Sequence, residues 1–394
     1  MYFLKHQALK SYRDRLVHLY GDRADRCLER LNILLSRYDI PIDPRMHGKA
    51  KWSQEDIVLI TYGDMVTKDG DAPLQTLREF ALDHLKGSVN TLHILPFFPY
   101  SSDDGFSVID YRQVDPDLGN WGHIDALAGD FRLMMDLVLN HVSSHSAWFK
   151  DYVSGVMPCK DYFIEVPANT DLSDVVRPRN SDLLRRTDTR DGVRYLWTTF
   201  SEDQIDVDFG NDDVLFEYLD ILLLYLEHGA HIVRLDAIAY LWKKIGTSCI
   251  HLPETHEVVK LMRQVMHAVA PGAILITETN VPHEENISYF GHGDEAHLVY
   301  QFSLPPLLLH ALVKGDARHL RAWADKAFDA PRGCSFFNFT ASHDGIGVRP
   351  LEGIIPDRQI EALCKMVRRK GGYVSTKSNS DGSKSPYELN ITYY

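Results

Sequence analysis

The stretch His231-Ile-Val-Arg-Leu-Asp236 is a short apolar run that ends in a carboxylate. Further runs of this kind recur along the chain, and stretches with helical spacing of apolar residues separate them. These runs span residues 57–62, 91–96, 133–138, 273–278, 298–302 and 335–339. Continuous apolar strands that alternate with helices are typical of a parallel sheet buried on both faces.

Polar residues stand at or soon after the ends of these runs, among them Asn140, His141, Asp236, Glu278 and Asp344. Functional side chains at the carboxyl ends of successive strands are typical of a TIM barrel. A doubly wound sheet also alternates strands and helices, but it would not readily bring so many strand ends to one point. The sequence therefore predicts an α/β protein with a (β/α)8 TIM barrel. Seven strands can be assigned, and we expect the eighth strand and a C-terminal β-domain to be missing from this chain.

The segment after the third strand is long, rich in Asp, Arg, Pro and Asn, and weakly periodic. A loop of that length is rarely structureless in a compact enzyme, so we expect a small inserted domain. The predicted organisation is an N-terminal helical extension at 1–50, the catalytic barrel at 51–142 and 206–350, the inserted domain B at 143–205, and a lid loop region with a truncated end at 351–394. Within the last part, the sequence predicts a helix near 357–369 and a loop from Gly371 to Ser385.

Composition limits the classes of partner. The formal net charge of -13 argues against a nucleic-acid or anionic-membrane surface, because both would repel the chain. The sequence contains no apolar run of the roughly 18 residues that a membrane span needs, and its first residues lack a secretory apolar region. The five cysteines are far apart and form no CxxC pair, which is typical of reduced thiols in a cytoplasmic protein.

Three carboxylates at strand ends favour glycoside cleavage. Taken singly, each would more often be a helix cap or an ion-pair partner, but their order and position favour a shared site. A retaining enzyme needs one carboxylate to attack the anomeric carbon and a second carboxyl, about 5–5.5 Å away, to act as acid and base. Asp236 and Glu278 are the candidates, with Asp344 to stabilise positive charge in the transition state. Arg234 lies two residues before Asp236 and so on the same face of the strand, where it favours the ionised nucleophile.

Together these segments resemble the signature regions of the α-amylase superfamily, glycoside hydrolase family 13, and within it the sucrose phosphorylase subfamily. The resemblance covers roughly residues 55–394 and rests on 59–64, 93–98, 105–106, 136–141, 234–236, 246–249, 277–280, 302–312 and 342–347.

The resemblance implies roles for named residues. Asp236 matches the nucleophile, Glu278 the acid/base and Asp344 the transition-state stabiliser. The residues implied for binding the glucosyl group are Asp103, Phe106, His141, Arg234 and His343. It implies transfer of an α-glucosyl group from a small α-glucoside to inorganic phosphate, giving α-glucose 1-phosphate, with no metal and no organic cofactor.

The sequence defines less clearly which leaving group is attached to the glucosyl group of the donor substrate. The segments 277–286, 338–350 and 381–390 look more like glucosylglycerate and sucrose 6'-phosphate phosphorylases than like the plain sucrose enzyme. Arg349, Lys377 and Lys384 are candidates to bind an anionic leaving group or phosphate, or are simply solvated loop residues. Hydrolysis or transglucosylation by the same residues, and an inactive truncated sugar-binding remnant, stay as alternatives. The oligomeric state is also open, with a homodimer as one alternative.

Overall fold

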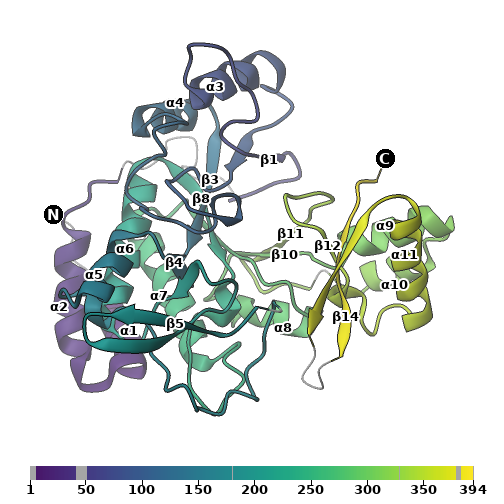
Figure 1. Ribbon diagram of the computed structural model, residues 1–394. Helices are drawn as coiled ribbons and strands as arrows, with labels where there is room; N and C mark the ends of the chain where they lie inside the picture. Colours follow the sequence, from purple (N-terminus) through teal and green to yellow (C-terminus); the bar gives the residue numbers. More distant parts are fainter. Residues whose placement is uncertain (1–5, 41–50, 180, 328, 379–382, 394) are drawn as a thin grey trace. The chain divides into compact units, whose positions relative to one another are not determined.

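A computed structural model describes residues 6–40, 51–179, 181–327, 329–378 and 383–393 (Figure 1). The chain divides into two compact units. The first unit comprises Met1–Val175 and Ser181–Leu275, and the second comprises Val176–Asn180 and Ile276–Tyr394. The predicted boundaries of the barrel and of the inserted domain are not tested by this division and stay predictions. Residues 41–50 of the predicted extension lie outside the described residues.

A parallel sheet positions the candidate catalytic residues. In the first unit its strand order is β1-β2-β3-β8-β9, and in the second it is β9-β10-β11, because the unit boundary falls inside β9. The strands are β1 (Val58–Thr61), β2 (Thr91–Ile94), β3 (Arg132–Val138), β8 (Ala230–Asp236), β9 (Ile274–Thr277), β10 (Leu298–Tyr300) and β11 (Ser335–Phe337). Each predicted apolar run coincides with one of these strands to within two residues at either end, so the seven predicted strands are confirmed.

Helices connect successive strands of this sheet, as the alternating pattern predicts. They are α3 (Pro73–His84), α4 (Trp121–Asp130), α6 (Asp212–Glu227), α7 (Pro253–Val269), and α9 (Leu304–Lys314) with α10 (Arg318–Ala324). All seven residues of β8 are buried, and β3 is buried except for its first residue. Burial on both faces explains why these strands are continuous apolar runs. It also means that a charged side chain in them needs a partner.

Between β3 and β8 the first unit contains a small mixed region. Its elements are β4 (His141–Ser143), α5 (Ala147–Ser154), η4 (Cys159–Asp161), β5 (Leu184–Thr189), β6 (Gly192–Trp197) and β7 (Gln204–Asp206). Strands β4 and β7 pair antiparallel, and β5 and β6 form a hairpin. A separate apolar cluster supports this region and contains Val166, Leu183, Trp197 and Cys249.

The end of the second unit differs from the prediction. The helix expected near 357–369 is α11 (Asp357–Arg369), but the expected loop from Gly371 to Ser385 is wrong. Strands β13 (Tyr373–Ser378) and β14 (Lys384–Asn390) form an antiparallel sheet with β12 (Ile346–Gly347), in the order β12-β14-β13. Val374 and Leu389 are buried in one cluster with Val367 of α11, so packing of alternate side chains outweighs the Gly- and Ser-rich composition.

Shorter elements complete the described chain: η1 (Gly21–Arg23), η3 (Asp103–Gly105), η5 (Ile238–Tyr240), α8 (His283–Ile287), η6 (Ser288–Phe290) and η7 (Arg349–Leu351). All five cysteines are buried and unbridged. None of the described helices combines the length and the apolar character needed to cross a membrane.

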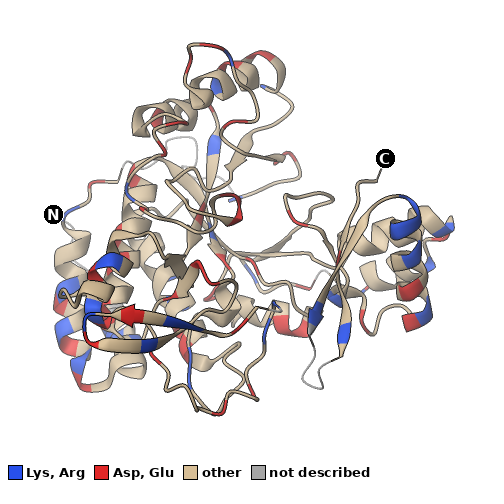
Figure 2. Ribbon diagram, viewed as in Figure 1, with Lys and Arg blue, Asp and Glu red and all other residues tan. Residues whose placement is uncertain are grey.

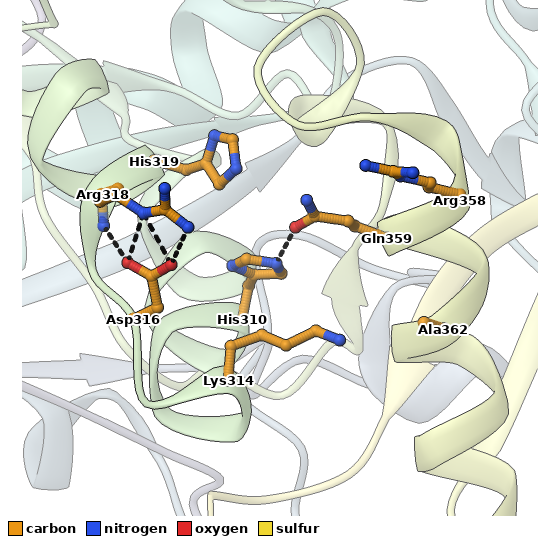
Figure 3. A pocket seen from close by; sticks show the side chains of 8 residues that line it. All are labelled: His310, Lys314, Asp316, Arg318, His319, Arg358, Gln359 and Ala362. Atoms are coloured by element: carbon orange, nitrogen blue, oxygen red, sulfur yellow. Dashed lines mark hydrogen bonds and ion pairs between the residues drawn. The ribbon is translucent and has the colours of Figure 1, made fainter.

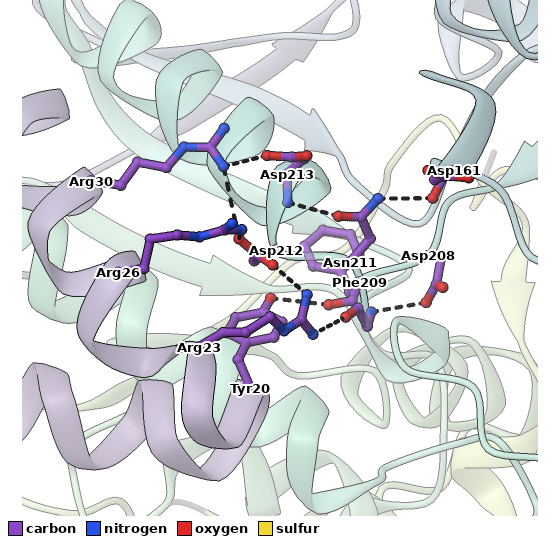
Figure 4. A network of polar contacts seen from close by, with 11 residues as sticks. Tyr20, Arg23, Arg26, Arg30, Asp161, Asp208, Phe209, Asn211, Asp212 and Asp213 are labelled. Carbon is purple, nitrogen blue, oxygen red and sulfur yellow. Dashed lines mark hydrogen bonds and ion pairs between the residues drawn. The ribbon is translucent and has the colours of Figure 1, made fainter. Parts of the chain in front are cut away.

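After the N-terminal helix α1 (His6–Tyr20), the short turn η1 and the helix α2 (Ala24–Leu35) are joined to α6 by ion pairs (Figure 4). Arg23 and Arg26 both bind the carboxylate of Asp212, the first residue of α6, the latter at 2.9 Å. The hydroxyl of Tyr20 donates to the carbonyl oxygen of Phe209 at 3.0 Å. The first turn of α6 carries two acidic residues, Asp212 and Asp213, which match the helix dipole and the arginines that face them (Figure 2).

We expect Asp212→Asn to lower the free energy of unfolding by about 1–2 kcal/mol at neutral pH, because Arg23 and Arg26 lose their buried partner. Burial raises the pKa of Asp212, but the arginines outweigh it and lower that pKa overall. A carboxyl with a lowered pKa stabilises the fold above its unfolded-state pKa, and this stability is lost as the pH falls through the folded-state value. Urea unfolding at neutral and acidic pH should therefore show a difference that shrinks in acid. Asp213→Asn is the matched control, since Asp213 pairs with Arg30 and is 38% exposed.

Candidate active site

Asp236 is the last residue of β8, and its side chain is 11% exposed. Nη1 of Arg234 lies 2.6 Å from Oδ1 of Asp236 and 2.6 Å from Oδ1 of Asp136. The predicted shared face of Arg234 and Asp236 is therefore present. Ala237, directly after Asp236, has a left-handed backbone with φ of 49°, a conformation that favours glycine. Strain of this kind is often retained where a functional side chain has to be aimed.

A line of buried polar contacts continues from Arg234 across neighbouring strands. In the sheet register Asp136 of β3 lies opposite Arg234 of β8, and the second carboxylate oxygen of Asp136 is 2.7 Å from Nε2 of His93. His93 lies on β2 and is 1% exposed. Asp136 thus holds Arg234 on one side and His93 on the other. Sequence reasoning gave neither Asp136 nor His93 a role, because their partners lie on other strands.

Burial and charge act in opposite directions on the nucleophile candidate. Burial raises the pKa of Asp236, and the nearby carboxylate of Asp136 raises it further. The Arg234 guanidinium and His141 lower it, and the net direction is upward. As expected from the sequence, the positive charge of Arg234 by itself lowers the pKa of Asp236 and so favours the ionised form. This effect counteracts part of the cost of burying the charge.

The loop after β2 places Asp103 and Phe106 in the first unit with Arg234. The Arg234 guanidinium carbon lies 5.7 Å from the centre of the Phe106 ring, within cation–π range. Asp103 and Asp104 have left-handed backbone conformations, with φ of 56° and 48°. At Gly105 a Cβ atom would meet the carbonyl oxygen of Pro96 at 2.8 Å, so this tight turn requires glycine.

His141 joins the same group from the start of β4. Its Nε2 lies 3.0 Å from the carbonyl oxygen of Phe106 and 3.1 Å from the side-chain nitrogen of Gln204. That Gln204 nitrogen also donates to Oδ2 of Asp103 at 2.9 Å. The structure therefore brings together all the first-unit residues that the sequence predicted: Asp103, Phe106, His141, Arg234 and Asp236. Gln204 was missed, since a glutamine in a weakly periodic segment gives no signal.

The side-chain amide of Asn140 is hydrogen-bonded to other side chains of the protein. Its side-chain nitrogen donates to Asp206 at 3.0 Å, and its oxygen accepts from Lys243 at 2.6 Å. Lys243 is also ion-paired with Asp206 at 2.5 Å. These contacts use both ends of the amide. Among the described residues, no group of three or more His, Cys, Asp or Glu side chains has an arrangement that could hold a metal ion.

A second carboxylate missed by the sequence analysis, Asp203, fixes the loop that carries Asp103 and Phe106. Its oxygens accept hydrogen bonds from four serine hydroxyls, those of Ser101, Ser102, Ser107 and Ser144. The first three serines flank the Asp103–Phe106 turn, and Ser144 follows β4. Burial alone would raise the pKa of Asp203, but these hydroxyls lower it to about 2.

We expect Asp203→Ala to lower the free energy of unfolding by about 1–2 kcal/mol at neutral pH and to raise KM, because the turn loses its shared acceptor. With its pKa lowered to about 2, Asp203 stabilises the fold above the ordinary carboxyl range. This stability is lost as the pH falls toward 2. Thermal unfolding across this range and steady-state kinetics at neutral pH would check both effects. Glu202→Ala, at an exposed neighbouring position, should change neither, and an equal effect there would contradict the role of Asp203.

The remaining predicted residues lie in the second unit. Glu278 directly follows β9 and is partly buried. His343 and Asp344 precede β12, and Nε2 of His343 lies 3.4 Å from Oδ2 of Asp344, whose side chain is 48% exposed. Arg349 begins η7, and its buried Nε has no hydrogen-bond partner among the described residues.

In the second unit, burial and a neighbour of like charge together shift the pKa of Lys377 and that of Glu388. Burial lowers the pKa of Lys377, and the positive charge of Arg349 lowers it further. Burial and the negative charge of Asp344 raise the pKa of Glu388 to about 7. Lys377 and Lys384 lie on strands β13 and β14, where the sequence analysis placed them on loops. Sequence reasoning missed Glu388, because its approach to Asp344 depends on the pairing of β14 with β12.

Comparison with known proteins places the chain in a family. The sequence profile of the family described as "Alpha amylase, catalytic domain" matches residues 72–338. A glucosylglycerate phosphorylase of Spirochaeta thermophila is 51% identical over 387 residues, which is 97% of this chain and 66% of that protein. A glucosylglycerate phosphorylase of Escherichia coli is 49% identical over 347 residues, which is 88% of this chain and 62% of that protein. The chain thus spans about two thirds of the length of these curated relatives.

A solved structure supports the same placement. The crystal structure of sucrose 6F-phosphate phosphorylase from Thermoanaerobacter thermosaccharolyticum matches with a TM-score of 0.76 at 28% identity. The match covers 88% of this chain and 72% of that one. The predicted TIM-barrel fold and the resemblance stated from sequence are thereby confirmed. The chain belongs to the α-amylase family, glycoside hydrolase family 13.

Proposed function

We propose that this protein is a retaining glycoside phosphorylase that transfers the α-glucosyl group of glucosylglycerate to inorganic phosphate. The products are α-glucose 1-phosphate and glycerate. One observation carries the choice of donor: relatives that match 97% and 88% of the chain at about half identity are glucosylglycerate phosphorylases. The phosphorylases of sucrose and of sucrose 6-phosphate match at 32% and 28% identity.

In the proposed first step, a carboxylate oxygen of Asp236 attacks the anomeric carbon as the bond to the glycerate oxygen breaks. Glu278 donates its proton to that oxygen, so glycerate leaves with a neutral hydroxyl group and a covalent glucosyl-enzyme remains. Asp344 stabilises positive charge on the ring in the transition state. Support for Asp236 comes from its burial at a strand end and from its ion pair with Arg234.

In the proposed second step, Glu278 is now ionised and takes a proton from phosphate, whose oxygen attacks the anomeric carbon. The bond to Asp236 breaks, and two inversions give α-glucose 1-phosphate with the original configuration. Asp103, Phe106, His141, Arg234 and His343 are proposed to hold the glucosyl group. The first four of these are already linked by contacts in the first unit.

An anionic donor and phosphate both require positive charge near the reacting groups. Arg349 and Lys377 are close enough for Arg349 to lower the pKa of Lys377, so the second unit gathers two cations. We propose that Arg349, with Lys377, binds the carboxylate of the glycerate group or the phosphate. The protein is further proposed to act in the cytoplasm on small substrates alone, without a metal or an organic cofactor. We also propose that residues 143–205 form the inserted domain B and that residues 51–142 and 206–350 form the catalytic barrel.

The test is release of α-glucose 1-phosphate from a donor panel with and without inorganic phosphate. The panel contains glucosylglycerate, sucrose, sucrose 6'-phosphate and glucosylglycerol. Phosphate-dependent release from glucosylglycerate at the highest kcat/KM is expected. Free glucose as the product in the presence of phosphate would instead establish a hydrolase. Preference for sucrose or its phosphate would overturn the donor assignment.

A further inference from the structure

The second unit contains a basic cavity that none of the predicted catalytic residues lines. Its volume is about 400 Å³, and it lies among α9, α10 and α11 (Figure 3). The lining residues are His310, Lys314, Asp316, Arg318, His319, Arg358, Gln359 and Ala362. This lining contains three lysine or arginine side chains and a single carboxylate, in a chain whose formal net charge is -13. A concentration of positive charge in a hollow of such a chain favours an anionic ligand.

The single carboxylate, that of Asp316, is already ion-paired with Arg318. Arg318 binds Asp316 through one edge of its guanidinium, with Nε at 2.8 Å and Nη2 at 2.7 Å from Oδ2. Hydrogen bonds from Arg318 lower the pKa of Asp316 to about 2, so the pair stays ionised. Within the described part of the chain, the side chains of Lys314 and Arg358 have neither a hydrogen bond nor an ion pair. Two positive charges are therefore available to a ligand.

A partly buried hydrogen bond joins two residues of the cavity lining and leaves a further donor. Nε2 of His310, a residue only 3% exposed, lies 2.6 Å from Oε1 of Gln359. With its oxygen engaged, the Gln359 amide has its nitrogen left as a donor. Figure 3 shows Gln359 between His310 and Arg358, with Lys314 below His310. Gln359 and Arg358 are also in the first turn of α11, whose backbone carries partial positive charge.

We propose that this cavity binds the phosphate group of a small phosphate monoester or inorganic phosphate itself, at a site separate from the catalytic residues. The groups offered are an ammonium, a guanidinium and an amide donor, and they match an anion with several acceptor oxygens. The cavity volume lies within the roughly 300–1,000 Å³ of small-molecule sites, which leaves room for a short carbon skeleton beside the phosphate.

The site is tested by isothermal titration calorimetry with two probes, inorganic phosphate and glycerol 3-phosphate, which lacks a glucosyl group. The variant is Lys314→Gln with Arg358→Gln. The matched control is Lys365→Gln with Arg369→Gln, which removes two exposed charges from α11 outside the cavity. We expect the cavity variant to bind at least one probe about tenfold more weakly or worse than wild type, and the control to bind it as wild type does.

The probe that binds more tightly identifies the source of the phosphate group. Tighter variant-sensitive binding of glycerol 3-phosphate assigns an organic ester, and tighter variant-sensitive binding of phosphate assigns the free ion. Superimposable isotherms for wild type and cavity variant would overturn the site, as would an equal loss in the control. Absence of binding of both probes by wild type would also overturn it. Because the readout is binding, these outcomes do not depend on the donor-panel result.

Discussion

The Asp236→Asn variant is expected to lose phosphorolysis by on the order of 10⁴-fold or more, because an amide cannot form the covalent ester with the anomeric carbon. The substitution keeps the size of the side chain, and its amide oxygen can still accept from Arg234. The loss should therefore appear in kcat, with little change in the free energy of unfolding. The mass of protein quenched during turnover should show an added glucosyl group in wild type and none in the variant.

The control is Asp208→Asn, at a partly buried aspartate of the first unit whose pKa burial also raises. Asp208 accepts from the backbone nitrogen of Gly210 and has no proposed catalytic role. This variant should keep activity. Turnover of Asp236→Asn within tenfold of wild type, or a glucosyl adduct that persists in it, would remove Asp236 from the role of nucleophile.

The Glu278→Gln variant is expected to discriminate between donors. A glycerate leaving group needs protonation, so kcat for glucosylglycerate should fall by about 10²- to 10⁴-fold. An activated donor such as α-glucosyl fluoride needs no proton to leave, and formation of the glucosyl-enzyme from it should be nearly unchanged. Pre-steady-state release of fluoride measures the first step with the activated donor. Steady-state release of α-glucose 1-phosphate measures turnover of glucosylglycerate.

Glu284→Gln, at an exposed position of α8 in the same unit, serves as the matched control and should behave as wild type with both donors. The result that counts against Glu278 as the acid and base is a similar loss with the fluoride and with glucosylglycerate. Such a loss would indicate a general role in binding or in folding instead.

Local sequence patterns predicted the sheet because burial on both faces leaves a direct trace in composition. The seven apolar runs coincide closely with the seven parallel strands, and Arg234 and Asp236 share a face because side chains alternate along a strand. The same logic failed at Gly371–Ser385. There the strands β13 and β14 depend on packing of Val374 and Leu389 against α11. The many turn-forming residues in this segment predict a loop instead of strands.

What the sequence by itself determined is the family, the barrel strands and the charged residues at their ends, since each depends on residue type and spacing along the chain. Only the tertiary structure decided which groups touch. His93 meets Asp136, Gln204 meets Asp103, and four serines meet Asp203, across separations of 43, 101 and up to 102 residues. The basic cavity likewise depends on how α9, α10 and α11 pack. Contacts between residues so far apart follow from the folding of the chain, and no local pattern encodes them.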